Sequence, residues 1–167
     1  LIGISVIPAV LLGFLFKIFN VNFFSLKIIA IASIIGAVIL LSADKFNKLK
    51  ISIKSPVMEF FIAGLFQCLA FIPGFSRSGS CITAFLILGK KKDEAIISSI
   101  LMSFPIIILS FVSNLKDLEN IKINIDLIFI FIISFLSAYF TLVFFIKYIN
   151  KIGFTPYVIY RIFLGSV

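Results

Sequence analysis

Long apolar runs separated by short, lysine-rich segments make up most of this chain. An α-helix needs roughly 20 apolar residues to cross a membrane. The runs at 23–42, 95–112 and 126–146 are close to that length, and apolar sequence also fills 1–16 and 153–167. The pattern predicts an all-α fold, a polytopic membrane protein with a single integral membrane domain over 1–167.

Composition narrows the class of protein further. Hydrophobic residues make up 62% of the chain and charged residues only 13%, which excludes an ordinary soluble domain. The apolar runs are unbroken rather than alternating, which argues against a β-barrel. The net charge of +8 comes from lysines in short loops between the runs. The positive-inside rule explains such loops, so we expect no nucleic acid partner.

The two ends of the sequence lie inside apolar runs. Leu1 is not a methionine, and Val167 ends a run that is too short to be a complete span. No basic region precedes the first run, which argues against a signal peptide. We interpret the sequence as a fragment, or as the product of a gene truncated at its 5′ end.

A short apolar segment at 81–89 breaks the pattern of full spans. Nine helical residues reach only about 14 Å, half of a hydrocarbon core. Lysine-rich segments at 43–55 and 90–94 flank the region on both sides, and the positive-inside rule places both in the cytoplasm. We therefore expect a re-entrant helix-loop-helix hairpin at about 57–89, whose polar loop lines a cavity. The same rule places 113–124 outside the cell.

The polar stretch from Pro73 to Ser80 carries the candidate chemistry. An arginine at membrane depth is costly and needs a partner, and a phosphate group is suited to a guanidinium. Small hydroxyl-bearing and glycine residues at a helix start add donors and close backbone approach. We take Arg77, Ser76 and Ser78 as candidate catalytic residues. The phosphate-binding candidates are Gly74, Gly79 and Ser80, and the candidates for the cavity wall are Gln67, Thr83 and Arg161.

Several of these candidates also have a purely structural interpretation. Ser78 or Ser80 could cap a helix that begins near Cys81. The Thr83 hydroxyl could bond back to the preceding turn. Arg161 could snorkel to an interface or pair with another helix. Arg77 could form an ion pair with a carboxylate such as Glu59.

The inventory of reactive groups is short. The chain has no histidine, and no span contains two carboxylates at helical spacing. We therefore expect no metal site within it and no evident acid/base pair. Cys68 and Cys81 are expected to be free thiols. The four tyrosines, including Tyr157 and Tyr160, are expected at the membrane interfaces because tryptophan is absent.

The polar stretch resembles the motif of the undecaprenyl-diphosphate phosphatase family, also called bacitracin-resistance proteins. That motif reads Pro-Gly-x-Ser-Arg-Ser-x-x-Thr. It matches at Pro73, Gly74, Ser76, Arg77 and Ser78, whereas the threonine position is occupied by Cys81. Segments 64–70, 103–105 and 160–161, together with Gly165, are also similar to the family, so the resemblance covers essentially the whole chain.

The resemblance implies a function and a fuller fold. Family members remove one phosphate from undecaprenyl diphosphate in the bacterial plasma (inner) membrane, which recycles the lipid carrier for cell-wall synthesis. Their fold has two inverted repeats, and this chain would hold the second. A glutamate-rich motif in the other half, and a divalent metal (Mg²⁺ or Ca²⁺) with ligands outside this chain, are implied as well.

The partners implied are a polyprenyl diphosphate lipid substrate and membrane lipids, and a homo-oligomer is left open. Two other functions also remain open at this stage. One is a transporter or flippase for an anionic lipid, because transporters too aim helix ends at anions. The other is a catalytically dead remnant that lacks the glutamate motif.

Overall fold

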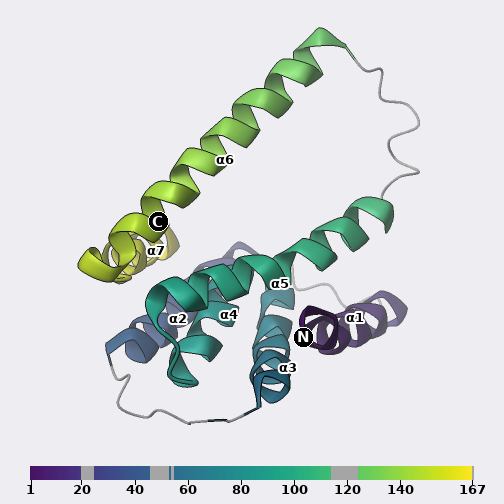
Figure 1. Ribbon diagram of the computed structural model, residues 1–167. Helices are drawn as coiled ribbons and strands as arrows, with labels where there is room; N and C mark the ends of the chain where they lie inside the picture. The colour runs from purple at the N-terminus through teal and green to yellow at the C-terminus, as the bar shows by residue number, and fades with distance from the viewer. Residues whose placement is uncertain (20–24, 46–52, 54, 114–123, 167) are drawn as a thin grey trace.

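The computed structural model describes residues 1–19, 25–45, 53, 55–113 and 124–166. Within these residues it is made of helices and contains no strand. The helices are α1 (Ile2–Ile18), α2 (Leu26–Lys45), α3 (Pro56–Gln67), the 3₁₀ turn η1 (Cys68–Phe71), α4 (Arg77–Ile87), α5 (Lys92–Ser113), α6 (Ile125–Ile152) and α7 (Thr155–Ser166) (Figure 1).

Three of the described helices, α2, α5 and α6, are long and apolar enough to cross a membrane. They match the runs predicted at 23–42, 95–112 and 126–146, apart from the residues of these runs that the structure does not describe. The expected all-α polytopic membrane fold is therefore confirmed. The sidedness assigned to 43–55 and 113–124 falls largely on residues outside the described part and stays a prediction.

Helix α4 forms the centre of the molecule. Six consecutive side chains of α4, from Cys81 to Leu86, are buried. Helices α2, α3 and α5 all pack against α4 (Figure 1). A helix that is surrounded in this way can be apolar on every side, which explains why 81–89 shows no amphipathic pattern.

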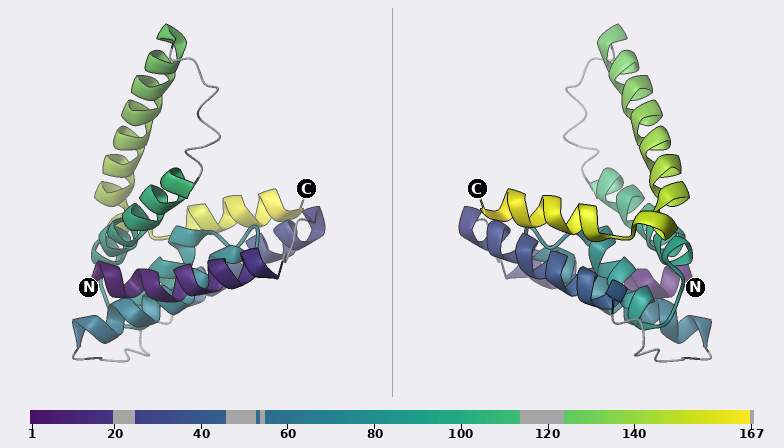
Figure 2. Two further views of the ribbon diagram at one scale, coloured as in Figure 1. Left: turned by 90° about the vertical axis from the view of Figure 1, so that its right-hand side faces the viewer. Right: turned by 90° about the vertical axis from the view of Figure 1, so that its left-hand side faces the viewer.

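Helix α6, unlike α4, makes little contact with the rest of the molecule. It projects away from the other helices, as both views in Figure 2 show. Ile149, close to the C-terminal end of α6, is buried. The apolar side chains of α6 are exposed along nearly the whole length of the helix. Exposed apolar surface of this extent is stable in lipid rather than in water, so we assign this surface to the membrane.

The hairpin predicted at about 57–89 forms from α3, η1 and α4, with different boundaries. The prediction that the second helix begins near Cys81 is wrong, because α4 already begins at Arg77. Lys90, just after α4, forms an ion pair of 2.9 Å with Glu59 in the first turn of α3. The start of α3 and the end of α4 therefore lie at the same level, as a hairpin requires. Whether the hairpin is re-entrant in a membrane stays a prediction.

A second ion pair ties this end of the hairpin to the spanning helices. Lys92 at the start of α5 contacts Asp44 near the end of α2 at 2.7 Å. The backbone N–H of Phe154, just before α7, also donates to Asp44 at 3.4 Å. Polar groups of α2, α3 and α5, together with Lys90 and the backbone of Phe154, thus gather at one end of the helices, while the motif loop lies at the other end of the hairpin.

Candidate functional site

Ser76 forms the N-cap of α4 and fixes the shape of the motif loop. Its hydroxyl accepts a hydrogen bond from the backbone N–H of Gly79 at 3.2 Å. Its φ of 60° is a conformation that residues other than glycine rarely adopt. The cap is therefore Ser76 and neither Ser78 nor Ser80, the two serines considered for this position. A serine oxygen placed at the cap satisfies one of the free amides in the first turn, and the helix starts four residues earlier than predicted.

The remaining motif residues lie in the first turn of α4. The Ser80 hydroxyl is buried and donates to the carbonyl oxygen of Ser76 at 3.0 Å. Gly79 is buried too, whereas Ser78 is exposed. The Ser80 hydroxyl therefore stabilises the start of α4, whereas the exposed side chain of Ser78 is accessible to a ligand.

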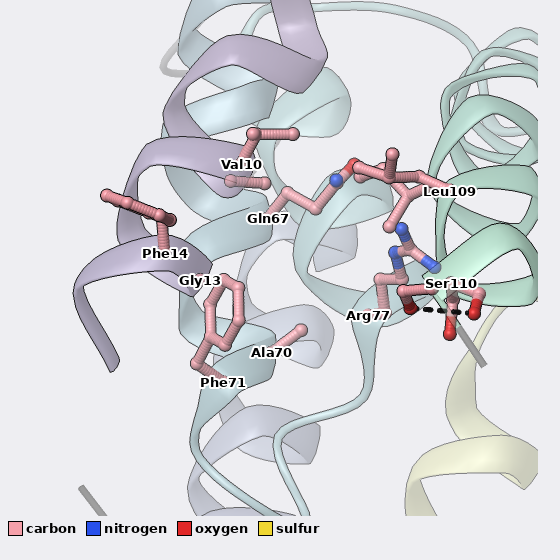
Figure 3. A pocket seen from close by; sticks show the side chains of 12 residues that line it. Val10, Gly13, Phe14, Gln67, Ala70, Phe71, Arg77, Leu109 and Ser110 are labelled. Atoms are coloured by element: carbon pink, nitrogen blue, oxygen red, sulfur yellow. Dashed lines mark hydrogen bonds between the residues drawn. The ribbon is translucent and has the colours of Figure 1, made fainter. Parts of the chain in front are cut away.

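Arg77 occupies the first position of α4 and extends into a cavity of about 590 Å³. Figure 3 shows its side chain directed toward Leu109 and Ser110 of α5, with Gln67 reaching in from α3. Its Nη2 atom is buried and makes no hydrogen bond with any described residue. Glu59 pairs with Lys90 at the opposite end of the hairpin, which removes it as the expected partner of Arg77.

Gln67 lines the Arg77 cavity and also forms a hydrogen bond between α3 and α4. It is buried, lines the Arg77 cavity and accepts a hydrogen bond of 3.4 Å from the thiol of Cys81. Its amide nitrogen has no partner among the described residues. Cys81 stands at the threonine position of the motif. Its thiol therefore donates to Gln67 the hydrogen bond that a threonine hydroxyl could donate. Both cysteines are free thiols, as expected.

Thr83 does not line the Arg77 cavity. Its hydroxyl is buried and donates to the carbonyl oxygen of Gly79 at 2.7 Å. The structure therefore supports the back-bonded interpretation of this threonine rather than a place in the cavity wall.

Arg161 contacts the motif loop from α7. Only 5% of its surface is exposed, and its Nη2 atom donates a hydrogen bond to the carbonyl oxygen of Gly74. This burial is incompatible with snorkelling, which brings the charged group to water. Arg161 lines a second cavity, of about 800 Å³, together with Gly74 and Ser76.

Tyr157 is a site residue that the sequence analysis missed. Its hydroxyl lies 3.4 Å from Ser76 Oγ, and the Arg161 guanidinium lies over its ring at 5.8 Å from the centroid. The sequence did carry a signal, because Tyr157 stands four residues before Arg161 on one helix and therefore shares its face.

The motif is thus divided between two cavities. Arg77 lines one cavity, whereas Ser76 and Gly74 line the other together with Arg161. Both sides offer hydrogen-bond donors on arginine and hydroxyl groups. Among the described residues there is no group of three His, Cys, Asp or Glu side chains that could hold a metal. The arrangement suits the binding of an anion, and the described residues do not fit a metal ion.

Comparisons with known proteins agree with this description. A family model described as "Bacitracin resistance protein BacA" matches residues 1–167. The chain is 39% identical to the "Undecaprenyl-diphosphatase" of Bacillus subtilis (strain 168), over 99% of this chain and 63% of that protein. It is 37% identical to the "Undecaprenyl-diphosphatase" of Alcanivorax borkumensis (strain ATCC 700651 / DSM 11573 / NCIMB 13689 / SK2), over 99% of this chain and 64% of that protein.

The chain therefore spans less than two thirds of the length of these two relatives. The match nevertheless covers nearly all of its own residues, including the motif loop and both arginines. The chain belongs to the bacitracin resistance protein BacA family.

Proposed function

We propose that this chain carries the phosphate-binding part of an undecaprenyl-diphosphatase, a multi-pass enzyme of the bacterial plasma membrane. The observation that carries the proposal is the buried Nη2 atom of Arg77 at the start of α4, which has no partner among the described residues and lies in a cavity lined mainly by apolar residues. A charged donor without a partner in such surroundings is costly unless an anion binds it. The two relatives named as undecaprenyl-diphosphatases support the choice of anion.

The cavity suits a substrate with a charged head and an apolar chain. Arg77 and Gln67 supply polar atoms, and apolar side chains of α1 and α5 surround them. In the proposed reaction water attacks the terminal phosphorus, the bond to the bridging oxygen breaks, and inorganic phosphate leaves. Undecaprenyl phosphate remains in the membrane.

Arg77 would act on the charge of the phosphoryl group. A guanidinium can donate to two phosphate oxygens at once, and it stabilises the negative charge that develops as the bridging bond breaks. The start of α4 adds the positive end of the helix dipole. No carboxylate lines the Arg77 cavity in the described part of the chain, so the lining offers no base to take up the proton of the attacking water. The divalent metal implied by the family resemblance, with ligands outside this chain, stays a prediction.

The test is phosphate release from undecaprenyl diphosphate in detergent with magnesium. It compares the 167-residue chain with a form extended by any in-frame upstream coding sequence. We expect release by the extended form, a loss of at least about 100-fold in Arg77→Ala, and incomplete recovery in Arg77→Lys because the two-point contact is lost.

Lys91→Ala is the matched control, because it removes an exposed cation from the loop after the same hairpin. Full turnover in Arg77→Ala would refute the role of this arginine. Movement of the lipid across reconstituted vesicles without phosphate release would instead favour a transporter. Release by the short chain itself would show that the water-activating group lies within it.

A further inference from the structure

Asp44, near the end of α2, connects α2 to two other helices at the end of the molecule away from the motif loop. Only 6% of its side chain is exposed. Its Oδ1 atom lies 2.7 Å from Lys92 Nζ at the start of α5, and its Oδ2 atom accepts the backbone N–H of Phe154 at 3.4 Å. This carboxylate holds both partners to α2, because moving either one away would leave a buried polar group without its partner.

The contact with Phe154 places a carboxylate at the N-terminus of α7. The carbonyl oxygen of Phe154 accepts the first hydrogen bond of α7, from the N–H of Val158 at 3.0 Å, so Phe154 is the N-cap residue. The first turn of α7 contains no acidic residue of its own. A carboxylate bonded to the N-cap amide is one half of a capping box, and the helix dipole favours negative charge there. Asp44 therefore supplies this cap to α7 from a different helix.

The connection between α6 and α7 is shaped around the same contact. Gly153 has a φ of 73°, which glycine adopts without strain. A Cβ atom at this position would lie 3.3 Å from both Asp44 Oδ2 and Lys92 Nζ. The Lys92 ammonium also lies 6.0 Å from the centroid of the Phe154 ring. The start of α7 is thus fixed by contacts with α2 and α5 together.

Helix α7 transmits the position of its start to the motif loop. Phe154, Tyr157 and Arg161 stand three and four residues apart, so they share one face of α7. The Tyr157 hydroxyl lies 3.4 Å from Ser76 Oγ, and Arg161 donates to the carbonyl oxygen of Gly74. Helices α2 and α7 pack side by side, as both views in Figure 2 show. A distance of 3.4 Å is long for a hydrogen bond between hydroxyls, so even a small displacement of α7 breaks the contact.

We propose that Asp44 is a positioning residue of the diphosphatase reaction, a role that rests on the function proposed above. It holds the start of α7 so that Tyr157 and Arg161 contact the motif loop beside Arg77. Asp44 lines neither the Arg77 cavity nor the second cavity, so it acts through α7 and not on the substrate. A misplacement of about 1 Å in an active site can cost about 100-fold in rate. Loss of Asp44 should therefore lower kcat and leave KM, which depends on the Arg77 cavity, nearly unchanged.

The first test measures phosphate release by Asp44→Leu and Glu59→Leu in the extended form of the chain, at a temperature well below the Tm of either variant. Glu59 is the matched control, because its ion pair with Lys90 lies at the same end of the helices and does not involve α7. We expect kcat to fall at least about tenfold in Asp44→Leu and less than about twofold in Glu59→Leu, with KM within about threefold in both. Asp44→Glu keeps the carboxylate and should recover most of the turnover. Equal kcat values for the two leucine variants would overturn the proposal.

Amide hydrogen exchange tests the same positioning without turnover. In the purified 167-residue chain, Asp44→Leu should speed exchange at 154–161 and 72–79 by at least about tenfold, and Glu59→Leu should change neither segment. Unchanged exchange in Asp44→Leu would overturn the proposal. If no form of the chain releases phosphate, the proposed function fails, and exchange still decides whether Asp44 positions the motif loop. If Asp44→Leu does not fold, Asp44→Asn and Glu59→Gln repeat both comparisons, with an expected difference of about threefold.

Discussion

Replacing Gly74 by alanine should destabilise the protein, because the motif loop crosses α2 without room for a side chain. A Cβ atom on Gly74 would lie 2.9 Å from the Cα atom of Ile29 and closer still to its carbonyl oxygen. Both atoms belong to the backbone of a spanning helix and cannot move aside as a flexible side chain would. Gly74 also has a φ of +95°, which alanine adopts only at a cost.

The expected loss of stability has two parts. A left-handed conformation costs an alanine about 1–2 kcal/mol. Forcing an extra methyl group into packed surroundings costs about 1–3 kcal/mol. The sum is about 2–5 kcal/mol, and for a chain of this size each kcal/mol lowers Tm by about 2–4 °C. We therefore expect Tm to fall by about 4–20 °C.

The melting can be followed with a thiol-reactive fluorescent dye. Cys81 is fully buried and Cys68 partly buried, so unfolding exposes both thiols. Gly3→Ala is the matched control, because a Cβ at Gly3 would meet no atom within 4 Å. Gly64→Ala separates the two terms, since Gly64 lies inside α3 and its Cβ would come within 3.0 Å of the Ser5 backbone.

Equal melting temperatures for Gly74→Ala and Gly3→Ala would refute this reasoning. A fall in Gly74→Ala no larger than that in Gly64→Ala would show that steric overlap alone accounts for the effect, without a contribution from φ.

Three other substitutions each test one contact of the structure. Cys81→Thr should keep a hydrogen bond to Gln67 and retain at least wild-type turnover in the phosphate-release assay, so a large loss would contradict the role given to this contact. Asp44→Asn should lower stability by about 1–3 kcal/mol, measured by thiol-dye melting, because the ion pair with Lys92 is weakened. Thr83→Val should leave phosphate release within about threefold of wild type, since the Thr83 hydroxyl bonds only within α4, and a loss of 100-fold would place it in the reaction.

The sequence by itself determined the class of protein and predicted the kind of ligand. Unbroken apolar runs of bilayer length can satisfy their backbone only as helices in lipid, so the spanning helices α2, α5 and α6 followed from composition and length. The cost of an arginine in such surroundings pointed to an anion at Arg77 before any coordinate was known. The short segment at 81–89 also indicated the hairpin.

Only the tertiary structure decided how the motif is used. Sequence reasoning treated 73–80 as one loop around one ligand, whereas the structure starts α4 at Arg77 and places Ser76 and Arg77 in different cavities. The position of Arg161 depends on the packing of α7 against α2, a contact between segments more than 100 residues apart. No local pattern encodes such a contact. Arg161 was a candidate from the sequence, but its contact with Gly74, and the place of Tyr157 beside Ser76, were decided only by the assembly of the helices.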